Sequence, residues 1–212
     1  MVDIIRNMNN SNIREESGNI RSLFEKKVLG ECKLTLDMLD ERGNKNPSEW
    51  PKPPQLRGGL PYYPPNHEWV GFGLKVWDHY DNGNNDWIEE NGNPNEWAIA
   101  YQGIPCQAVK PICTKDGKFF STIEEGAKVQ KYRNYLNVNK ISQKLYPICG
   151  EGAYFSPHLE YAAMFSKGVI IMCKVNPKKL RIPKGFEDNE WIVDGTRDSV
   201  RPYRILFNLK YI

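Results

Sequence analysis

Apolar and polar residues alternate along several short stretches of this chain, and a period of two is typical of a half-buried β-strand. The run at residues 169–175 differs, because it is apolar almost throughout and is bounded by Gly168 and Pro177. That run is too short to cross a membrane and is typical of a strand at the centre of a sheet. Strands are expected near residues 73–77, 97–101, 153–156, 169–176, 180–182, 190–194 and 201–209.

A second spacing, with apolar residues three or four positions apart, predicts helices in three places. The first is near residues 19–29, and the second is residues 123–136, where acidic side chains suit a helix N-terminus. The third, residues 158–166, follows Ser156, which can cap the helix, and Pro157, which suits its first turn. A short strand at residues 153–155 is therefore expected to lead directly into a capped helix.

Residues 43–66 are dense in proline, glycine and asparagine, so neither a helix nor a central strand is expected there. Aromatic residues within the stretch, among them Tyr62 and Tyr63, predict an extended arm that packs onto the sheet. The stretch also suggests a division of the chain into two parts. Residues 1–56 would form a helical and extended N-terminal accessory segment, and residues 57–212 the main domain.

Composition limits the classes of function. The chain has 212 residues and 40% hydrophobic residues, which is enough for one domain with a true core and argues against global disorder. The net charge of +3 is dispersed, so nucleic acid is not indicated as a partner, and no apolar run is long enough for a membrane helix. The odd count of five cysteines, with no secretory signal, favours an intracellular protein, cytoplasmic or nuclear.

Three groups of residues were considered as metal or nucleic-acid sites. Residues 81–86 are rich in Asp and Asn but lack the terminal glutamate and flanking helices of a calcium loop. Cys106 and Cys113 have no neighbouring histidine to complete a zinc site, so no metal is expected. A small basic cluster is typical of a solvated turn, and consists of Lys178, Lys179, Arg181 and Lys184.

The stretch from Gly150 to Phe165 carries a resemblance to a known family. Its Gly-x-Gly-x-Tyr-Phe turn and the helix after it resemble the second signature of the ADP-ribosyltransferases, in their poly-ADP-ribose-polymerase-like branch. By that resemblance Tyr154 would lie against the nicotinamide of NAD, and Phe165 would be the second stacking aromatic. Ala162 stands where the family often has a serine that hydrogen-bonds the nicotinamide amide.

Two further signatures, one before this stretch and one after it, appear in the same order as in the family. Residues 101–104 resemble its His-Gly-Thr strand, with Gln102 in place of the histidine and Ile104 in place of the hydroxyl residue. Gly103 matches the glycine whose backbone grips the nicotinamide amide. Residues 189–193 resemble the Asn-Glu-Tyr-Ile-Val strand, so Glu190 matches the glutamate that stabilises the positive charge of the transition state.

The framework over residues 57–212 is similar to that of a eukaryotic set within this family, with an Arg-Gly-Gly arm and a closing Arg-Pro-Tyr strand, and this chain would be a divergent member of that set. The resemblance implies an α+β fold. Two mostly antiparallel, split sheets would surround a cleft, with a few helices at their flanks. The cleft would lie between the strands of Gly103 and Tyr154, with Glu190 at its floor.

Two functions are compatible with this resemblance. In the first, the chain transfers one ADP-ribose unit from NAD, its co-substrate, to a protein or another acceptor. In the second, it is a catalytically inactive module of the same fold that binds a protein or a nucleotide. Gln102, Ile104 and Ala162 favour the second, because Ile104 and Ala162 remove polar groups at the nicotinamide end.

Overall fold

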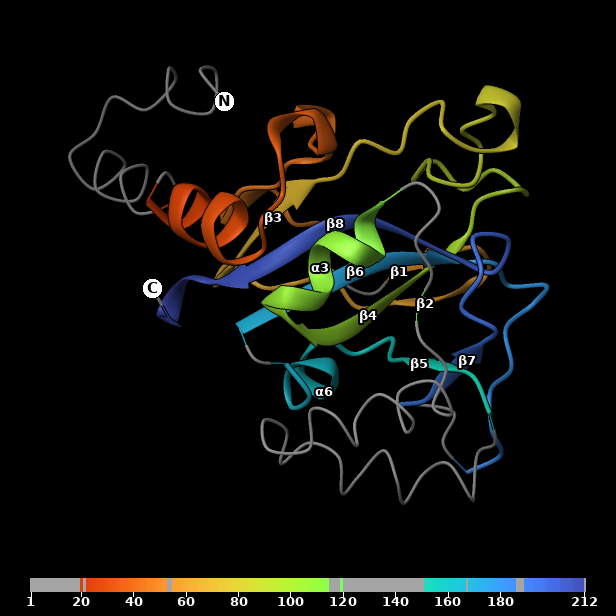
Figure 1. Ribbon diagram of the computed structural model, residues 1–212. Helices are drawn as coiled ribbons and strands as arrows, with labels where there is room; N and C mark the ends of the chain where they lie inside the picture. Colours follow the sequence, from red (N-terminus) through yellow and green to blue (C-terminus); the bar gives the residue numbers. More distant parts are fainter. Residues whose placement is uncertain are drawn as a thin grey trace.

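The computed structural model describes residues 20, 22–52, 55–114, 119, 151–166, 168–185 and 189–211. Its centre is a four-stranded sheet in the order β3-β8-β6-β4, and all three pairings are antiparallel. The strands are β3 (Trp69–Gly73), β4 (Ala98–Pro105), β6 (Gly168–Val175) and β8 (Val200–Asn208). Figure 1 shows β6 and β8 crossing the middle of the molecule. The expected α+β class with mostly antiparallel sheets is confirmed.

Strand β6 is the central strand that the apolar run predicted. All its residues after Gly168 are buried, so both faces of the strand are covered. It pairs along its length with β4 on one side and β8 on the other, with an irregularity between Met172 and Cys173. A strand buried on both faces has no polar side to show, which explains the continuous apolar sequence.

Two small sheets complete the strands. A hairpin joins β1 (Gln55–Arg57) to β2 (Leu60–Tyr62), and β5 (Ala153–Phe155) pairs with β7 (Trp191–Val193). Residues 180–182 contribute an isolated bridge between Arg181 and Ile192 in place of the expected strand. The strand expected at 73–77 was wrong: β3 ends at Gly73, and beyond it Leu74 bridges to Leu39 and Lys75 donates to the Met38 carbonyl. The alternation of apolar and polar residues continues beyond Gly73, although the chain there pairs with residues 38–39 and no longer with β8.

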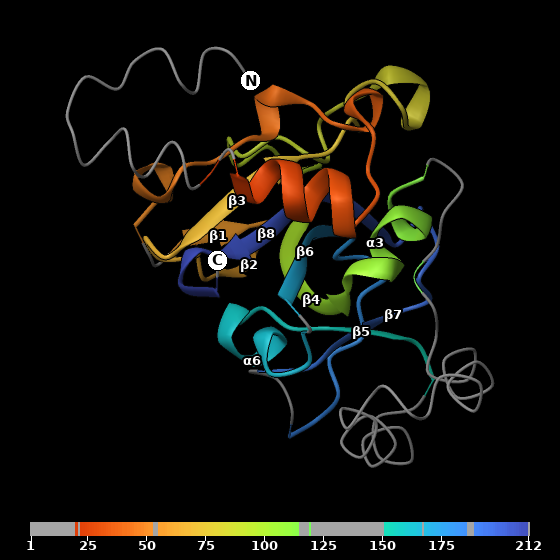
Figure 2. The ribbon, with the colours of Figure 1, turned by 60° about the vertical axis from the view of Figure 1, so that its left-hand side comes forward.

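The helix expected near residues 19–29 is present and continues to Glu31, but from Phe24 it is wound as a π-helix, η1 (Phe24–Glu31). A further helix, α3 (Cys106–Cys113), was not predicted, and it contains Pro111. Figures 1 and 2 show η1 and α3 next to each other on one face of the four-stranded sheet. The helix expected at 123–136 lies outside the described residues. Single-turn 3₁₀ helices are η2 (Leu36–Met38), η3 (Glu41–Gly43), η4 (Pro47–Glu49), η5 (Asp81–Gly83) and η6 (Leu209–Tyr211).

The helix expected at 158–166 is shorter, and its start differs from the prediction. It is α6 (Leu159–Ala163), and the residue at its N-cap is His158, whose side chain makes no capping bond. Ser156 instead accepts a hydrogen bond from the His158 backbone N–H at 3.1 Å, which closes the turn before the helix. Ser156 also bridges to Tyr101, so the sheet holds it two residues too early in the chain to act as the cap.

The predicted packing of the proline-rich arm is confirmed. Tyr62 is buried, and the Tyr101 hydroxyl donates to the Tyr63 carbonyl at 2.7 Å. Gly58 has a positive φ, and a Cβ there would lie 2.4 Å from the Ala98 nitrogen, so glycine allows the hairpin to approach β4. The chain before the arm shares the same core, since Val28 is fully buried and Trp50 Nε1 donates to the Trp69 carbonyl. Within the described ranges, no helix combines the length and apolar character that crossing a bilayer requires.

Candidate functional site

The predicted site begins where β5 joins the free edge of β4. Tyr101 and Ser156 exchange backbone hydrogen bonds of 2.7 and 2.9 Å across this junction. The next residue, Gln102, donates from its side-chain Nε2 to the Tyr154 carbonyl at 3.0 Å. Gln102 therefore links β4 to β5 through its side chain. The sequence alone did not indicate this role.

Gly103 presents its backbone at the same edge of β4. Tyr101 uses its N–H and C=O on Ser156, so both groups point away from β6. Because these directions alternate along a strand, the N–H and C=O of Gly103 leave β4 on the same side as those of Tyr101. Within the part of the chain that the structure describes, neither group hydrogen-bonds to β5 or α6. As far as the described residues are concerned, one donor and one acceptor are thus available side by side at this edge.

Helix α6 lies directly against Gly103. A Cβ at this position would be 2.2 Å from the Ala162 carbonyl oxygen and 2.6 Å from the Ser166 nitrogen, so any larger residue would push the helix away. Ala162 is buried in this contact, and Phe165 follows at the end of the helix, half-buried. Figure 2 shows α6 beside the β4 edge of the sheet. Gly103, Ala162 and Phe165 therefore lie together.

Tyr154 occupies the middle of β5, with buried neighbours on either side. It is half-buried while Phe155 is buried, so the tyrosine and not the phenylalanine is directed out of the core. The predicted partial exposure of Tyr154 is confirmed. That its ring lines a nucleotide cleft stays a prediction.

Glu190 lies immediately before β7 and is only 3% exposed. The hydroxyl of Tyr161, on α6, donates to Glu190 Oε1 at 2.5 Å. Burial raises the pKa of Glu190 above its ordinary value, and the hydrogen bond from Tyr161 opposes that rise because it favours the ionised form. A buried carboxylate is thus held next to the helix that packs on Gly103.

These contacts form a closed circuit through four of the predicted residues, Gln102, Tyr154, Glu190 and Gly103. Gln102 bonds to Tyr154, β5 pairs with β7, Glu190 bonds to Tyr161, and α6 returns to Gly103. Tyr161 was missed by the sequence reasoning. A signal existed, because Tyr161 and Phe165 are four residues apart and share a helix face, where their ring centroids are 5.2 Å apart.

Ile104 belongs to the core of the structure. Its side chain is buried, and it pairs with Val169 in the ladder between β4 and β6.

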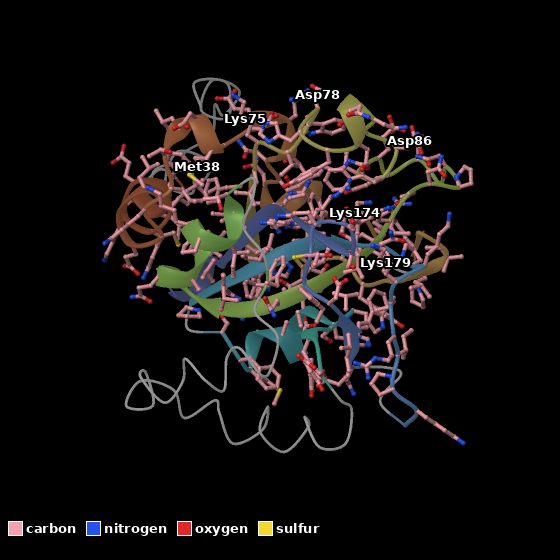
Figure 3. All side chains as sticks on the ribbon, turned by 45° about the vertical axis from the view of Figure 1, so that its right-hand side comes forward. Met38, Lys75, Asp78, Asp86, Lys174 and Lys179 are labelled. Atoms are coloured by element: carbon pink, nitrogen blue, oxygen red, sulfur yellow. The ribbon has the colours of Figure 1, made fainter. Side chains whose placement is uncertain are left out.

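A second cluster of buried charge lies elsewhere, around Lys174 of β6. Lys174 is fully buried, and Figure 3 places it beneath the loop that carries Asp78 and Asp86. Its ammonium group donates to Glu96 Oε1 at 3.3 Å and to the carbonyls of Glu89 and Trp97 at 3.0 and 3.2 Å. Burial lowers the pKa of Lys174 to about 8, although neighbouring carboxylates raise it. This cluster fastens the loop to the sheet.

Arg201 fastens the start of the same loop. Its guanidinium makes two hydrogen bonds to Asp81, of 2.7 and 2.8 Å, and a third to the Arg197 carbonyl at 2.8 Å. Three aromatic rings surround it within 4.4–4.7 Å, those of Tyr80, Trp87 and Trp97. The Arg201 guanidinium also holds the pKa of Asp81 below its ordinary value.

The Asp- and Asn-rich turn at residues 81–86 and the basic cluster, both considered as sites from the sequence, have local partners. Asp81 is bound to Arg201, and Asn85 donates to Asp78 at 2.7 Å, so the turn at 81–86 binds itself and β8. Among the described residues no group of three or more His, Cys, Asp or Glu side chains is placed to hold a metal ion. In the basic cluster, Arg181 donates to the Glu151 carbonyl, and Lys179 lies 3.7 Å from Asp198.

No protein-family model matches this chain, and no curated protein was found to be similar to it. Any functional assignment therefore depends on the signatures and on the geometry of the site.

Proposed function

We propose that this chain is an ADP-ribosyltransferase-like protein of the poly-ADP-ribose-polymerase-like branch, which transfers one ADP-ribose unit from NAD to a protein or another acceptor. In that reaction the bond between ribose and nicotinamide breaks, and a nucleophile of the acceptor bonds to the ribose carbon. The observation that supports the proposal best is the open backbone of Gly103, beside α6 and in the same circuit as Glu190.

The Gly103 edge suits a carboxamide. Such a group has an N–H₂ donor and an oxygen acceptor in one plane, and Gly103 has a C=O and an N–H pointing to the same side of β4. Two half-buried aromatic rings, Tyr154 and Phe165, belong to the elements around this edge and would stack on the nicotinamide ring. The close contact of α6 explains why this position is glycine.

Glu190 would act on the ribose. Positive charge develops at the ribose carbon as nicotinamide leaves, and a fixed carboxylate stabilises that charge more strongly in a buried site than in water. Burial works against ionisation of Glu190, and the hydroxyl of Tyr161 works in favour of it.

Gln102 would hold the donor less firmly than the histidine of the family. One N–H of its amide is used on Tyr154, which leaves a second N–H and the oxygen as groups that a ribose hydroxyl could meet. The loss of one neutral hydrogen bond costs about 1 kcal/mol net, which weakens binding roughly five- to tenfold without abolishing it. Because the His-Tyr-Glu set associated with chain extension is broken, the transfer would stop at one unit.

The alternative is a non-catalytic module of the same fold that binds a protein or nucleotide. The buried side chain of Ile104 and the methyl of Ala162 favour it, because neither offers a polar contact at the nicotinamide end. Under this alternative Gly103 and Tyr154 would serve a ligand that is not cleaved.

Nicotinamide release and label transfer from NAD distinguish the two functions. We expect turnover in the wild type and a loss of about 10²–10³ in rate for Glu190→Gln, the scale of losing one electrostatic group in a site. The matched control is Glu160→Gln, an exposed carboxylate on α6, which should leave the rate unchanged.

Thermal melting provides the binding measurement. NAD at 100 times its dissociation constant should stabilise the folded state by about 2.7 kcal/mol. A melting shift without turnover would favour the non-catalytic module. If NAD produced no turnover and no melting shift, the NAD-dependent function would be contradicted.

A further inference from the structure

We propose that Tyr161 is a positioning residue for Glu190: its hydroxyl fixes the carboxyl relative to Gly103. This inference rests on the proposed function for its meaning in catalysis, but the interaction itself can be measured without turnover. None of the three signatures assigns a role to Tyr161.

The first argument is the placement of the donor. Glu190 is 3% exposed, so water cannot readily satisfy its oxygens, and among the described side chains Tyr161 is the one that hydrogen-bonds to it. A hydrogen bond to a charged group is stronger than one between neutral groups, and shorter. Tyr161 therefore replaces part of the hydration that Glu190 loses on burial.

The second argument is the element that carries the tyrosine. Tyr161 lies on α6, next to Ala162, whose carbonyl is in contact with Gly103. The same five-residue helix thus touches the proposed nicotinamide edge and holds the proposed catalytic carboxylate. Through Tyr161, one element contacts both groups and so relates their positions.

The described elements that pair with β7 carry two further titratable residues. The titratable residue that faces β7 from β5 is Tyr154, and from the neighbouring segment it is Arg181, which donates to the Glu151 carbonyl. The pKa of Glu190 responds to burial, which raises it, and to Tyr161, which lowers it. Removal of the Tyr161 hydroxyl should therefore let burial raise the pKa of Glu190 further.

The direct test is a titration of the wild type and Tyr161→Phe with glutamate labelled at the side-chain carboxyl carbon, read by NMR. The Glu190 signal is assigned by its absence in Glu190→Gln. We expect the pKa of Glu190 to move further upward in Tyr161→Phe and to stay at the wild-type position in the matched control Tyr63→Phe, an exposed tyrosine. An unchanged titration in Tyr161→Phe would overturn the proposal.

A measurement on the wild type keeps the proposal testable if Tyr161→Phe fails to fold. With tyrosine labelled at the carbon that bears the hydroxyl, the Tyr161 signal should shift with pH in step with Glu190. A Tyr161 signal that ignores the Glu190 titration would overturn the proposal.

Activity provides the third readout. We expect Tyr161→Phe to lower kcat about 10- to 100-fold, the range that a lost hydrogen bond to a charged group represents, and to move the acid limb of the pH profile upward. An absence of turnover in the wild type would count against the proposed function alone, because the NMR titration would still decide the role of Tyr161.

Discussion

Two carboxylates of this protein, Glu96 and Glu190, are almost equally buried, at 2% and 3% exposure, yet their surroundings differ. Glu96 faces the ammonium of Lys174 at 3.3 Å and the guanidinium of Arg57 at 3.5 Å, and its other oxygen accepts the Gly92 N–H. Glu190 faces a single neutral hydroxyl among the described side chains. The charge of Glu96 is compensated by two cations, whereas burial of Glu190 costs folding free energy that a neutral hydroxyl offsets only in part.

The difference distinguishes a structural charge from a candidate functional one. Charges that are buried, paired and hydrogen-bonded hold elements together, and removing one partner is expensive. A buried carboxylate that lacks a counter-charge reduces stability, and such groups are concentrated at functional sites. The cluster of Lys174 and Glu96 belongs to the first kind, and Glu190 belongs to the second. Three substitutions test this distinction.

The largest effect is expected for Glu96→Gln. The amide keeps the shape of the side chain but leaves Lys174 buried without its nearest counter-charge, so we expect the free energy of unfolding to fall by about 3–5 kcal/mol. Urea denaturation followed by tryptophan fluorescence measures this. The control Asp198→Asn removes an exposed partner of Lys179 and should change stability by less than about 1 kcal/mol. Equal effects of the two substitutions would refute the distinction.

A smaller loss, about 2 kcal/mol, is expected for Arg201→Lys. Lysine keeps the charge but cannot make the two parallel bonds to Asp81 or stack its plane on three rings. The chain offers a matched control in Arg42, which makes a similar forked contact with Asp40 and lies over one ring, that of Trp77, but is largely exposed. Arg42→Lys should cost about 0–1 kcal/mol, measured in the same denaturation series.

The smallest effect on stability, and of opposite sign, is expected for Glu190→Gln. At neutral pH the variant should be as stable as the wild type or more stable by about 1 kcal/mol, because the amide carries no cost of burying a charge and still accepts from Tyr161.

The pH dependence of this difference follows from the raised pKa of Glu190. As pH rises above about 4.5, the carboxyl ionises first in the unfolded state, so the wild type loses stability through this window and the neutral variant does not. Below pH 4.5 the carboxyl is protonated in both states and the gap should close. Denaturation midpoints from pH 3 to pH 8 measure the effect. Strong destabilisation of Glu190→Gln at pH 7 would show that Glu190, like Glu96, is a structural charge.

The sequence by itself determined which stretches would be buried. The unbroken apolar run after Gly168 predicted the central strand β6, and the aromatic residues among the prolines predicted that the arm at residues 57–65 packs onto the sheet. It also indicated that Gly103 and Tyr154 belong to one region, and Gln102 joins their strands. Periodicity reports burial because side chains on one face of an element meet the same environment.

Periodicity does not report which partner a residue meets, and there the tertiary structure decided. The chain left β3 after Gly73 although its alternation continued, and α3 formed with a proline inside it where no helical pattern was recognised. The ion pair of Arg201 with Asp81 spans 120 residues, and the bond from Tyr161 to Glu190 spans 29. A tyrosine on a helix face and a glutamate before a strand are common in any sequence. Only the packing of α6 against Gly103, together with the pairing of β5 and β7, brings this tyrosine to this glutamate, because each of those contacts fixes the position of an element that carries one of them.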